Sequence, residues 1–162
     1  MSTLYVDTIT EKTSGNGVQI AGHVVQVVNV AYNTGVALST TSSAVETGLA
    51  ATITPKSNTS KILVLVNQNI QVSGSSYAQI VLRKGTIASS TIMAIMSSPE
   101  GYTNSADTEV NTIPMCYEDS PATTSATRYF CSMELLAGTT MYAQTSTGGT
   151  SVSTMTLMEI AQ

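Results

Sequence analysis

The chain has little of the chemistry on which most enzymes and nucleic-acid-binding proteins depend. Its 162 residues include no tryptophan, one phenylalanine and one histidine, and only 10% of them are charged. A typical soluble domain has about 25% charged residues. Six Lys and Arg residues against ten Asp and Glu residues give a net charge of −4. Such a chain has no basic patch for a phosphate backbone, so we expect no nucleic-acid partner.

Candidate catalytic and metal-binding residues are scarce. Ser-His-Asp chemistry would need the single histidine, His23, and no G-x-S-x-G motif is present. Zinc-type cysteine spacing and a phosphate loop with its lysine are also absent. The carboxylates include Asp107 with Glu109 and Glu118 with Asp119, whose spacing leaves a glycosidase-type acid pair open. Glu118 and Asp119 are also a candidate calcium site, but a solvated turn explains this pair more simply. The sequence therefore predicts no enzyme, no metal and no cofactor.

Long apolar segments and targeting signals are missing as well. No apolar run reaches about 18 residues, so we expect no membrane insertion. The opening MSTLYVDTITEKTSG lacks the basic and apolar regions of a signal peptide. We therefore expect synthesis in a cytoplasm.

Only two cysteines are present, Cys116 and Cys131, and both lie in strand-like runs. A hairpin centred near Ala122 to Ser125 would place them opposite each other, close enough to bridge in principle. In a reducing cytoplasm we expect buried free thiols instead.

The chain is rich in serine, threonine and short β-branched runs. Hydroxyl groups rather than charges supply its solubility, and threonine favours strands. From His23 onward, candidate strands recur roughly every 8–14 residues with turn signals between them. The run SKILVLVNQNIQVSG is apolar on both faces across Ile62–Val66, which predicts a central strand. The pattern predicts an all-β fold, an antiparallel β-sandwich or jelly roll of about eight strands.

Residues 1–22 have a different pattern. LYVDTIT alternates like a strand, SGNG signals a turn, and VQIAG alternates again. The segment has too few apolar side chains to bury by itself, so it needs a partner surface. We predict that residues 1–22 form an extended N-terminal arm for anchoring or oligomerisation, and that residues 23–162 form the sandwich domain. The apolar residues of the arm are Leu4, Val6, Ile9, Val18 and Ile20.

Two residue types allow more than one interpretation. The internal methionines gather in the C-terminal half, where they either fill gaps in the core or line a subunit interface. Tyr77, Tyr102 and Tyr117 are candidate surface contacts, with packing within a sheet as the alternative.

Four stretches carry a resemblance to known proteins. Val6 to Gly22, V-D-T-I-x-E-K-T-S-G-N-G-V-x-I-x-G, resembles the opening segment of tail-fibre and other virion proteins of marine and aquatic bacteriophages. Three further stretches are similar to a widespread phage module: ITPKSNTSKILVLV (Ile53–Val66), DSPATTSATRYFCSMEL (Asp119–Leu135) and TMTLMEIAQ (Thr154–Gln162). The resemblance implies a non-enzymatic virion structural protein that forms a homotrimer.

The leading hypothesis is a tail-fibre-type surface protein that contributes to host attachment. The arm would bind other virion proteins of the tail or capsid, and the sandwich loops would face the host, with a surface glycan as one potential ligand. The alternative is a capsid decoration (cement) protein that binds and stabilises the shell. In both cases the protein is assembled in the host cytoplasm and located in the virion. A soluble glycan-binding sandwich and a glycan-cleaving enzyme also stay open.

Overall fold

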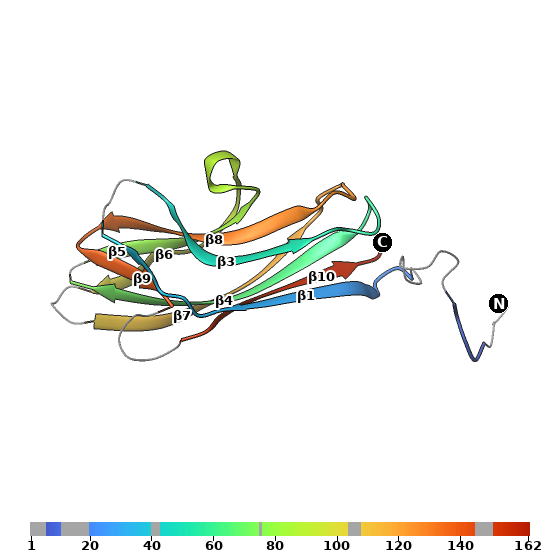
Figure 1. Ribbon diagram of the computed structural model, residues 1–162, viewed down its shortest axis with the longest axis horizontal. Coiled ribbons are helices and arrows are strands. Elements are labelled where there is room, and N and C mark those ends of the chain that lie inside the picture. Colours follow the sequence, from blue (N-terminus) through green and yellow to red (C-terminus); the bar gives the residue numbers. More distant parts are fainter. Residues whose placement is uncertain (1–5, 11–19, 40–42, 75, 104–107, 145–150) are drawn as a thin grey trace.

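The computed structural model describes the backbone of residues 6–10, 20–39, 43–74, 76–103, 108–144 and 151–162, and the side chains of all of these except 97–103 and 108–109. The described residues form two antiparallel sheets packed face to face (Figure 1). This confirms the predicted all-β, antiparallel β-sandwich. Within the described part the one helical segment is the short η1 (Ile87–Ser89).

The larger sheet, sheet A, has the order β1-β10-β4-β9-β2, and β7 pairs with the opposite edge of β4. Its strands are β1 (Val24–Tyr32), β2 (Val36–Leu38), β4 (Lys61–Ser73), β7 (Thr108–Asp119), β9 (Thr140–Ala143) and β10 (Ser153–Ile160). The smaller sheet, sheet B, has the order β3-β8-β5-β6. Its strands are β3 (Val45–Ile53), β5 (Ser76–Lys84), β6 (Thr91–Thr103) and β8 (Thr127–Ala137).

The strand order is that of a jelly roll. Without the short strands β2 and β9, sheet A runs β1-β10-β4-β7 and sheet B runs β3-β8-β5-β6. Early and late strands thus interleave in both sheets, as in two interlocked Greek keys. The start of β1 and the end of β10 lie at the same end of the sandwich, on the right of Figure 1.

Strand β4 lies at the centre of sheet A, as its two-sided apolar pattern predicts. It pairs with β10 and β9 along one edge and with β7 along the other. Its even-numbered residues from Ile62 to Val72 face sheet B and are buried, because side chains alternate along a strand. Leu63 and Leu65 face the opposite way and are half-buried.

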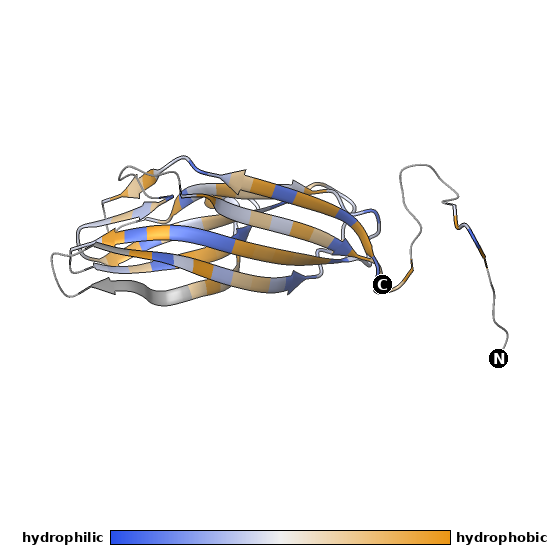
Figure 2. Ribbon diagram, turned by 90° about the horizontal axis from the view of Figure 1, so that it is seen from below, coloured by the Kyte–Doolittle hydropathy of each residue, from blue (hydrophilic) through white to orange (hydrophobic). Residues whose placement is uncertain are grey.

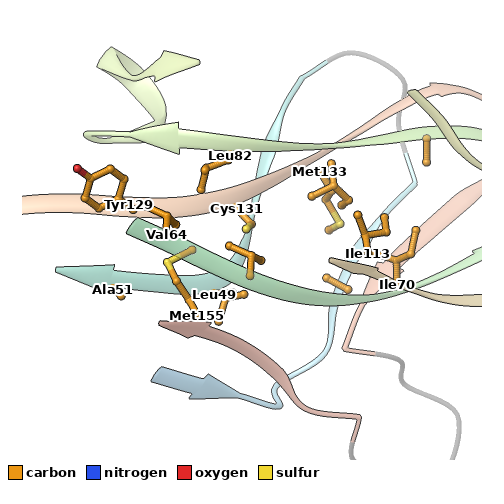
Figure 3. Close-up of a cluster of buried hydrophobic side chains, with 14 of the residues drawn as sticks. Leu49, Ala51, Val64, Ile70, Leu82, Ile113, Tyr129, Cys131, Met133 and Met155 are labelled. Carbon is orange, nitrogen blue, oxygen red and sulfur yellow. The ribbon is translucent and has the colours of Figure 1, made fainter. Parts of the chain in front are cut away.

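The core between the sheets is aliphatic and sulfur-rich. Figure 3 shows Val64 and Met155 of sheet A in one cluster with Leu82, Cys131 and Met133 of sheet B. Six of the seven internal methionines lie in the core or pack against it, as the first interpretation predicts. Met133, Met141 and Met155 are fully buried, and Met93, Met96 and Met115 pack against the core. Met158 is half-buried and faces outward from sheet A.

The predicted hairpin around Ala122 to Ser125 is wrong. Strand β7 belongs to sheet A and β8 to sheet B, so the connection between them crosses from one sheet to the other. Both strands have an apolar inward face, and these faces meet across the core rather than lying side by side in one sheet. Cys131 is buried as expected, but Cys116 is exposed, and both thiols are free.

A buried polar cluster lies where β4 changes partner from β10 to β9. Its members are Thr47, Gln68, Gln144 and Ser153, each at most 1% exposed. Gln68 receives a hydrogen bond from the Thr47 hydroxyl (2.9 Å) and donates through Nε2 to Gln144 Oε1 (2.7 Å). The Ser153 hydroxyl donates to the same Gln144 oxygen (3.0 Å) and accepts from the Asn69 amide (2.9 Å). Because these groups satisfy one another, they fix the pairing of β4 without a cost for unpaired polar atoms.

Gly48 gives a test of how tightly β1 packs on β3. It has a φ of +87°, and a Cβ there would lie 2.3 Å from Cε1 of the Tyr32 ring. Gly22 has a similar φ of +83°, but a Cβ there would meet nothing within 4 Å. The positive φ costs an alanine roughly 1–2 kcal/mol at either site. We expect Gly48→Ala to lower the free energy of unfolding in denaturant by clearly more than Gly22→Ala, and equal losses would show that the Tyr32 contact has no effect.

The two thiols give a second test. Burial raises the pKa of Cys131 to about 12. A maleimide at mildly alkaline pH should therefore modify Cys116 in the folded protein and leave Cys131 unmodified until unfolding, as measured by mass spectrometry. The unfolded thiol titrates near 8.5, so the stabilisation from the neutral Cys131 is complete below that pH and is lost as the pH rises towards 12. The decline should be weaker in Cys131→Ala, and rapid labelling of Cys131 in the folded state would contradict the burial.

Candidate assembly surface

The outward-facing side of sheet A carries a group of partly exposed apolar side chains among polar ones such as Asn29, Asn67 and Thr156. We term it the sheet A face. Its apolar members are Val24 and Val27 of β1, Met158 and Ile160 of β10, Leu63 and Leu65 of β4, and Pro114 and Cys116 of β7. The pairing register forms a continuous row across the sheet, because Val27 lies opposite Met158 and Met158 lies opposite Leu63. Val24 and Val27 are 51% and 54% exposed.

This face is hollowed between β4 and the edge strand β7. Leu65, Asn67, Pro114 and Cys116 line a shallow depression of about 360 Å³. Figure 2, viewed from below the sandwich as it stands in Figure 1, shows hydrophobic bands alternating with hydrophilic ones along the strands. A shallow apolar depression in a flat sheet is suited to a protein partner, whose side chains can fill it.

Some of the polar groups on the sheet A face are paired with one another. Lys61 and Glu118 form an ion pair (2.6 Å) at the end of the face where β4 begins. The Asn29 amide donates to the Thr156 hydroxyl (2.6 Å) between the apolar rows. The described charges that border the face therefore neutralise each other.

The outer side of sheet B differs, because its charged side chains cover β3, β8 and β5, although Ile92 and Ile95 of the edge strand β6 are 55% and 53% exposed. Arg128 binds Glu46 through two hydrogen bonds (3.0 and 2.7 Å), and its guanidinium lies 4.6 Å from the centre of the Phe130 ring. Arg83 forms an ion pair with Glu134 (2.6 Å). Phe130 faces outward yet is fully buried beneath these groups. Of the two outer faces, that of sheet A is the candidate for assembly.

The arm residues that the structure describes are exposed. Val6, Ile9 and Ile20 are 50%, 58% and 41% exposed, whereas Leu4 and Val18 lie outside the described residues. A turn leads from the arm into β1, in which the His23 amide donates to the Ile20 carbonyl (2.9 Å). The Gly22 amide donates to the Ala161 carbonyl (2.8 Å), which fixes the start of β1 beside the end of β10. The proposed role of the arm in assembly stays a prediction.

The structure does not bring the three predicted contact tyrosines together. Tyr77 lies in β5 and is 39% exposed, at the end of the sandwich opposite the start of β1. Tyr102 is close to it in the backbone register of β6, but its side chain lies outside the described part. Tyr117 is in the other sheet and packs against the core. A surface contact through Tyr77 and Tyr102 stays a prediction.

The acidic neighbours Glu118 and Asp119 point to opposite sides of β7. Glu118 binds Lys61 on the outer face, whereas Asp119 accepts hydrogen bonds from the Tyr129 hydroxyl (2.6 Å) and Lys84 (2.8 Å) between the sheets. Burial and the bond to Asp119 raise the pKa of Tyr129 well above its usual value. The two carboxylates therefore cannot chelate one ion, and Asp119 instead joins sheet A to sheet B. The side chains of Asp107 and Glu109 lie outside the described residues.

A buried carboxylate that we did not predict, Glu159, closes one end of the sandwich. It accepts hydrogen bonds from the backbone amides of Lys56 (2.7 Å) and Ser57 (3.3 Å) and from the Gln26 side chain (2.5 Å). Strand alternation could have revealed it, because Glu159 shares the inward face of Met155 and Leu157. His23 is exposed at the same end.

The described residues contain no group of three or more His, Cys, Asp or Glu side chains placed to hold a metal ion. Among them there is also no helix long and apolar enough to span a membrane.

Comparison with known proteins adds little about function. No protein-family model matches the sequence, and no curated protein matches it. Among solved structures, the chain is similar to the VP2 subviral particle of infectious bursal disease virus, with a TM-score of 0.47 and 11% identity over 85% of this chain and 37% of that chain. A structure of the Gt strain of that virus has a TM-score of 0.48 and 11% identity, over 100% of this chain and 43% of that chain.

A structure of the Gx strain has a TM-score of 0.43 and 8% identity, over 85% of this chain and 37% of that chain. The chain thus spans 37–43% of the length of these solved chains. Similarity at this level gives no information about what the present chain binds or assembles with.

Proposed function

We propose that the chain is a non-enzymatic structural protein of a bacteriophage virion, a tail-fibre-type surface protein that forms a homotrimer and contributes to host attachment. The observation that carries the assembly part of this proposal is the partly exposed apolar row of the sheet A face, together with the exposed arm residues Val6, Ile9 and Ile20. A chain that leaves both uncovered gains stability when copies associate.

The resemblance to phage virion proteins supports the virion part of the proposal. Two of the resembling stretches, Ile53–Val66 and Thr154–Gln162, are far apart in sequence but pair with each other as β4 and β10. Together they supply Leu63, Leu65, Met158 and Ile160 to the sheet A face. The resemblance and the candidate surface therefore fall on the same residues.

In this proposal the two ends of the sandwich have different roles. The arm leaves from the end where β1 starts, so that end is directed towards other virion proteins of the tail or capsid. Tyr77 and the connections after β4 and β8 lie at the opposite end and are directed towards the host. Three weak sites per trimer would raise a modest affinity through effective concentration.

A capsid decoration protein would use the same face and arm, so the number of copies per particle distinguishes it from a tail fibre. We expect purified particles to contain far fewer copies of this protein than of the major capsid protein, as quantitative mass spectrometry would show. A ratio near one would instead identify a decoration protein, and absence from the particles would overturn the virion assignment.

Substitution of the sheet A face tests the homotrimer. Val27 in β1 and Ile95 in β6 are equally exposed, at 54% and 53%, but lie on different sheets. An unpaired carboxylate in a buried interface weakens association about tenfold or more. We expect Val27→Asp to shift trimers to monomers in sedimentation velocity, whereas Ile95→Asp leaves them intact.

Thermal unfolding of both variants controls for damage to the fold. A trimer unaffected by Val27→Asp would remove the sheet A face from the interface. An unmodified chain that stays monomeric at every concentration would overturn the homotrimer itself.

A further inference from the structure

The edges of the two sheets are not equally protected. The long edge strands are β1 and β7 in sheet A and β3 and β6 in sheet B. An edge strand presents unpaired backbone groups that another strand can join, and proteins usually block it with proline, charge or a bulge.

Three of these edges carry such blocks. Strand β7 contains Pro114 and the charged residue Glu118. Strand β6 contains Pro99, and its register with β5 shifts several times. Strand β3 contains Glu46, followed by a register shift before Ala50.

Strand β1 lacks these protections over most of its length. Its sequence VVQVVNVAY has no proline and no charged residue. Its single register shift lies at the start, between Val24 and Gln26, and the pairing with β10 is regular from there to Tyr32. The outward residues Val27, Asn29 and Ala31 are exposed. A strand added to this edge would also extend the apolar row that begins at Val27.

We infer that the free edge of β1 accepts the N-terminal arm of a second copy of this chain as an added strand. This inference rests on the proposed homotrimer and names the contact that closes it. The arm segment LYVDTIT alternates with the period of a strand, and the described Val6 and Ile9 are exposed. Backbone pairing suits this donor because it requires no charge on either side.

The reach of the arm is sufficient for a neighbour. A fully extended chain covers about 3.3 Å per residue, so the segment from Val6 to Ile20 spans up to about 46 Å. A sheet of four strands at about 4.8 Å spacing is less than half as wide. The arm can therefore cross from its own start to β1 of an adjacent copy.

Two other partners for this edge fit less well. The chain's own arm would have to return along β1 from the turn at Ile20–His23, in which Gly22 has the φ of +83° typical of a type II turn. Such turns match the twist of a two-residue hairpin poorly. Pairing of two β1 strands would give a symmetric dimer and leave both arms uncovered, whereas arm addition is head-to-tail and is compatible with a closed ring of three copies.

Cross-linking between differently tagged full-length copies tests the inference. One copy carries Ile9→Cys and the other carries Ala31→Cys, both in a Cys116→Ser background, and a short bismaleimide is added to the mixed oligomer. Cys131 is fully buried and is left unchanged. We expect a product with both tags and a link between positions 9 and 31. The matched acceptor Ala88→Cys, exposed in η1 beside sheet B, should link much less.

Each other result would overturn the inference. Linking within single chains carrying both substitutions, without mixed products, would mean that the arm returns to its own β1. Links between two copies of position 31 would mean a β1–β1 dimer, and equal linking at position 88 would mean non-specific contact. Trimers that show no link from 9 to 31 would reject the arm contact and leave the homotrimer standing, whereas monomers throughout would reject both.

Hydrogen exchange gives an independent readout on the same full-length protein. Amides in β1 should exchange more slowly in the oligomer than in the variant Val6→Asp/Ile9→Asp, because an added strand would bind them. Amides in the protected edge β7 should not differ between the two. Equal exchange in β1 would contradict strand addition even if the copies were linked.

Discussion

The backbone pairing of β4 is the constraint on which the rest of the structure depends. This strand holds β10 and β9 on one edge and β7 on the other, so it fixes the order of sheet A. Its inward residues form the centre of the core, and its outward Leu63 and Leu65 form the centre of the sheet A face. The polar cluster around Gln68 lies at the point along β4 where its pairing partner changes from β10 to β9. A shift in the pairing register of β4 by one residue would turn its core side chains to the surface and its surface side chains into the core.

Low charge explains why one outer face is left apolar. The few charged side chains are used where they bind specific partners. Asp119 joins the sheets, Glu159 holds the connection between β3 and β4, and Arg128 and Arg83 cover the outer side of sheet B. Only Lys61 and Glu118 among the described charged residues border the sheet A face, and they neutralise each other. Strand β1 itself contains no charged residue that would block its edge.

Strand alternation could predict the fold class and the central place of β4, because both depend on local pattern. It could not predict that β7 and β8 lie in different sheets. Two strands with an apolar inward face have the same sequence pattern whether they pair side by side in one sheet or face each other across the core. The two-sided pattern at Leu63 and Leu65 predicted burial on both faces, yet the single chain buries only one. That difference is the reason why we propose this face as an assembly surface. The polar cluster depends on contacts between residues distant in sequence, such as Gln68 and Gln144, which no local pattern contains.

The sheet A face and the β1 edge would contribute to association in different ways. Backbone hydrogen bonds at an edge are worth about 0.5–1.5 kcal/mol each and are indifferent to side-chain identity. Burial of apolar surface contributes about 25 cal/mol per Å² and depends on which side chains meet. In the proposed assembly the edge would therefore supply affinity for any extended strand, and the face would supply the choice of partner. Because Val24 and Val27 belong to both, an added strand would also cover part of the face, and the two contributions would be coupled rather than additive.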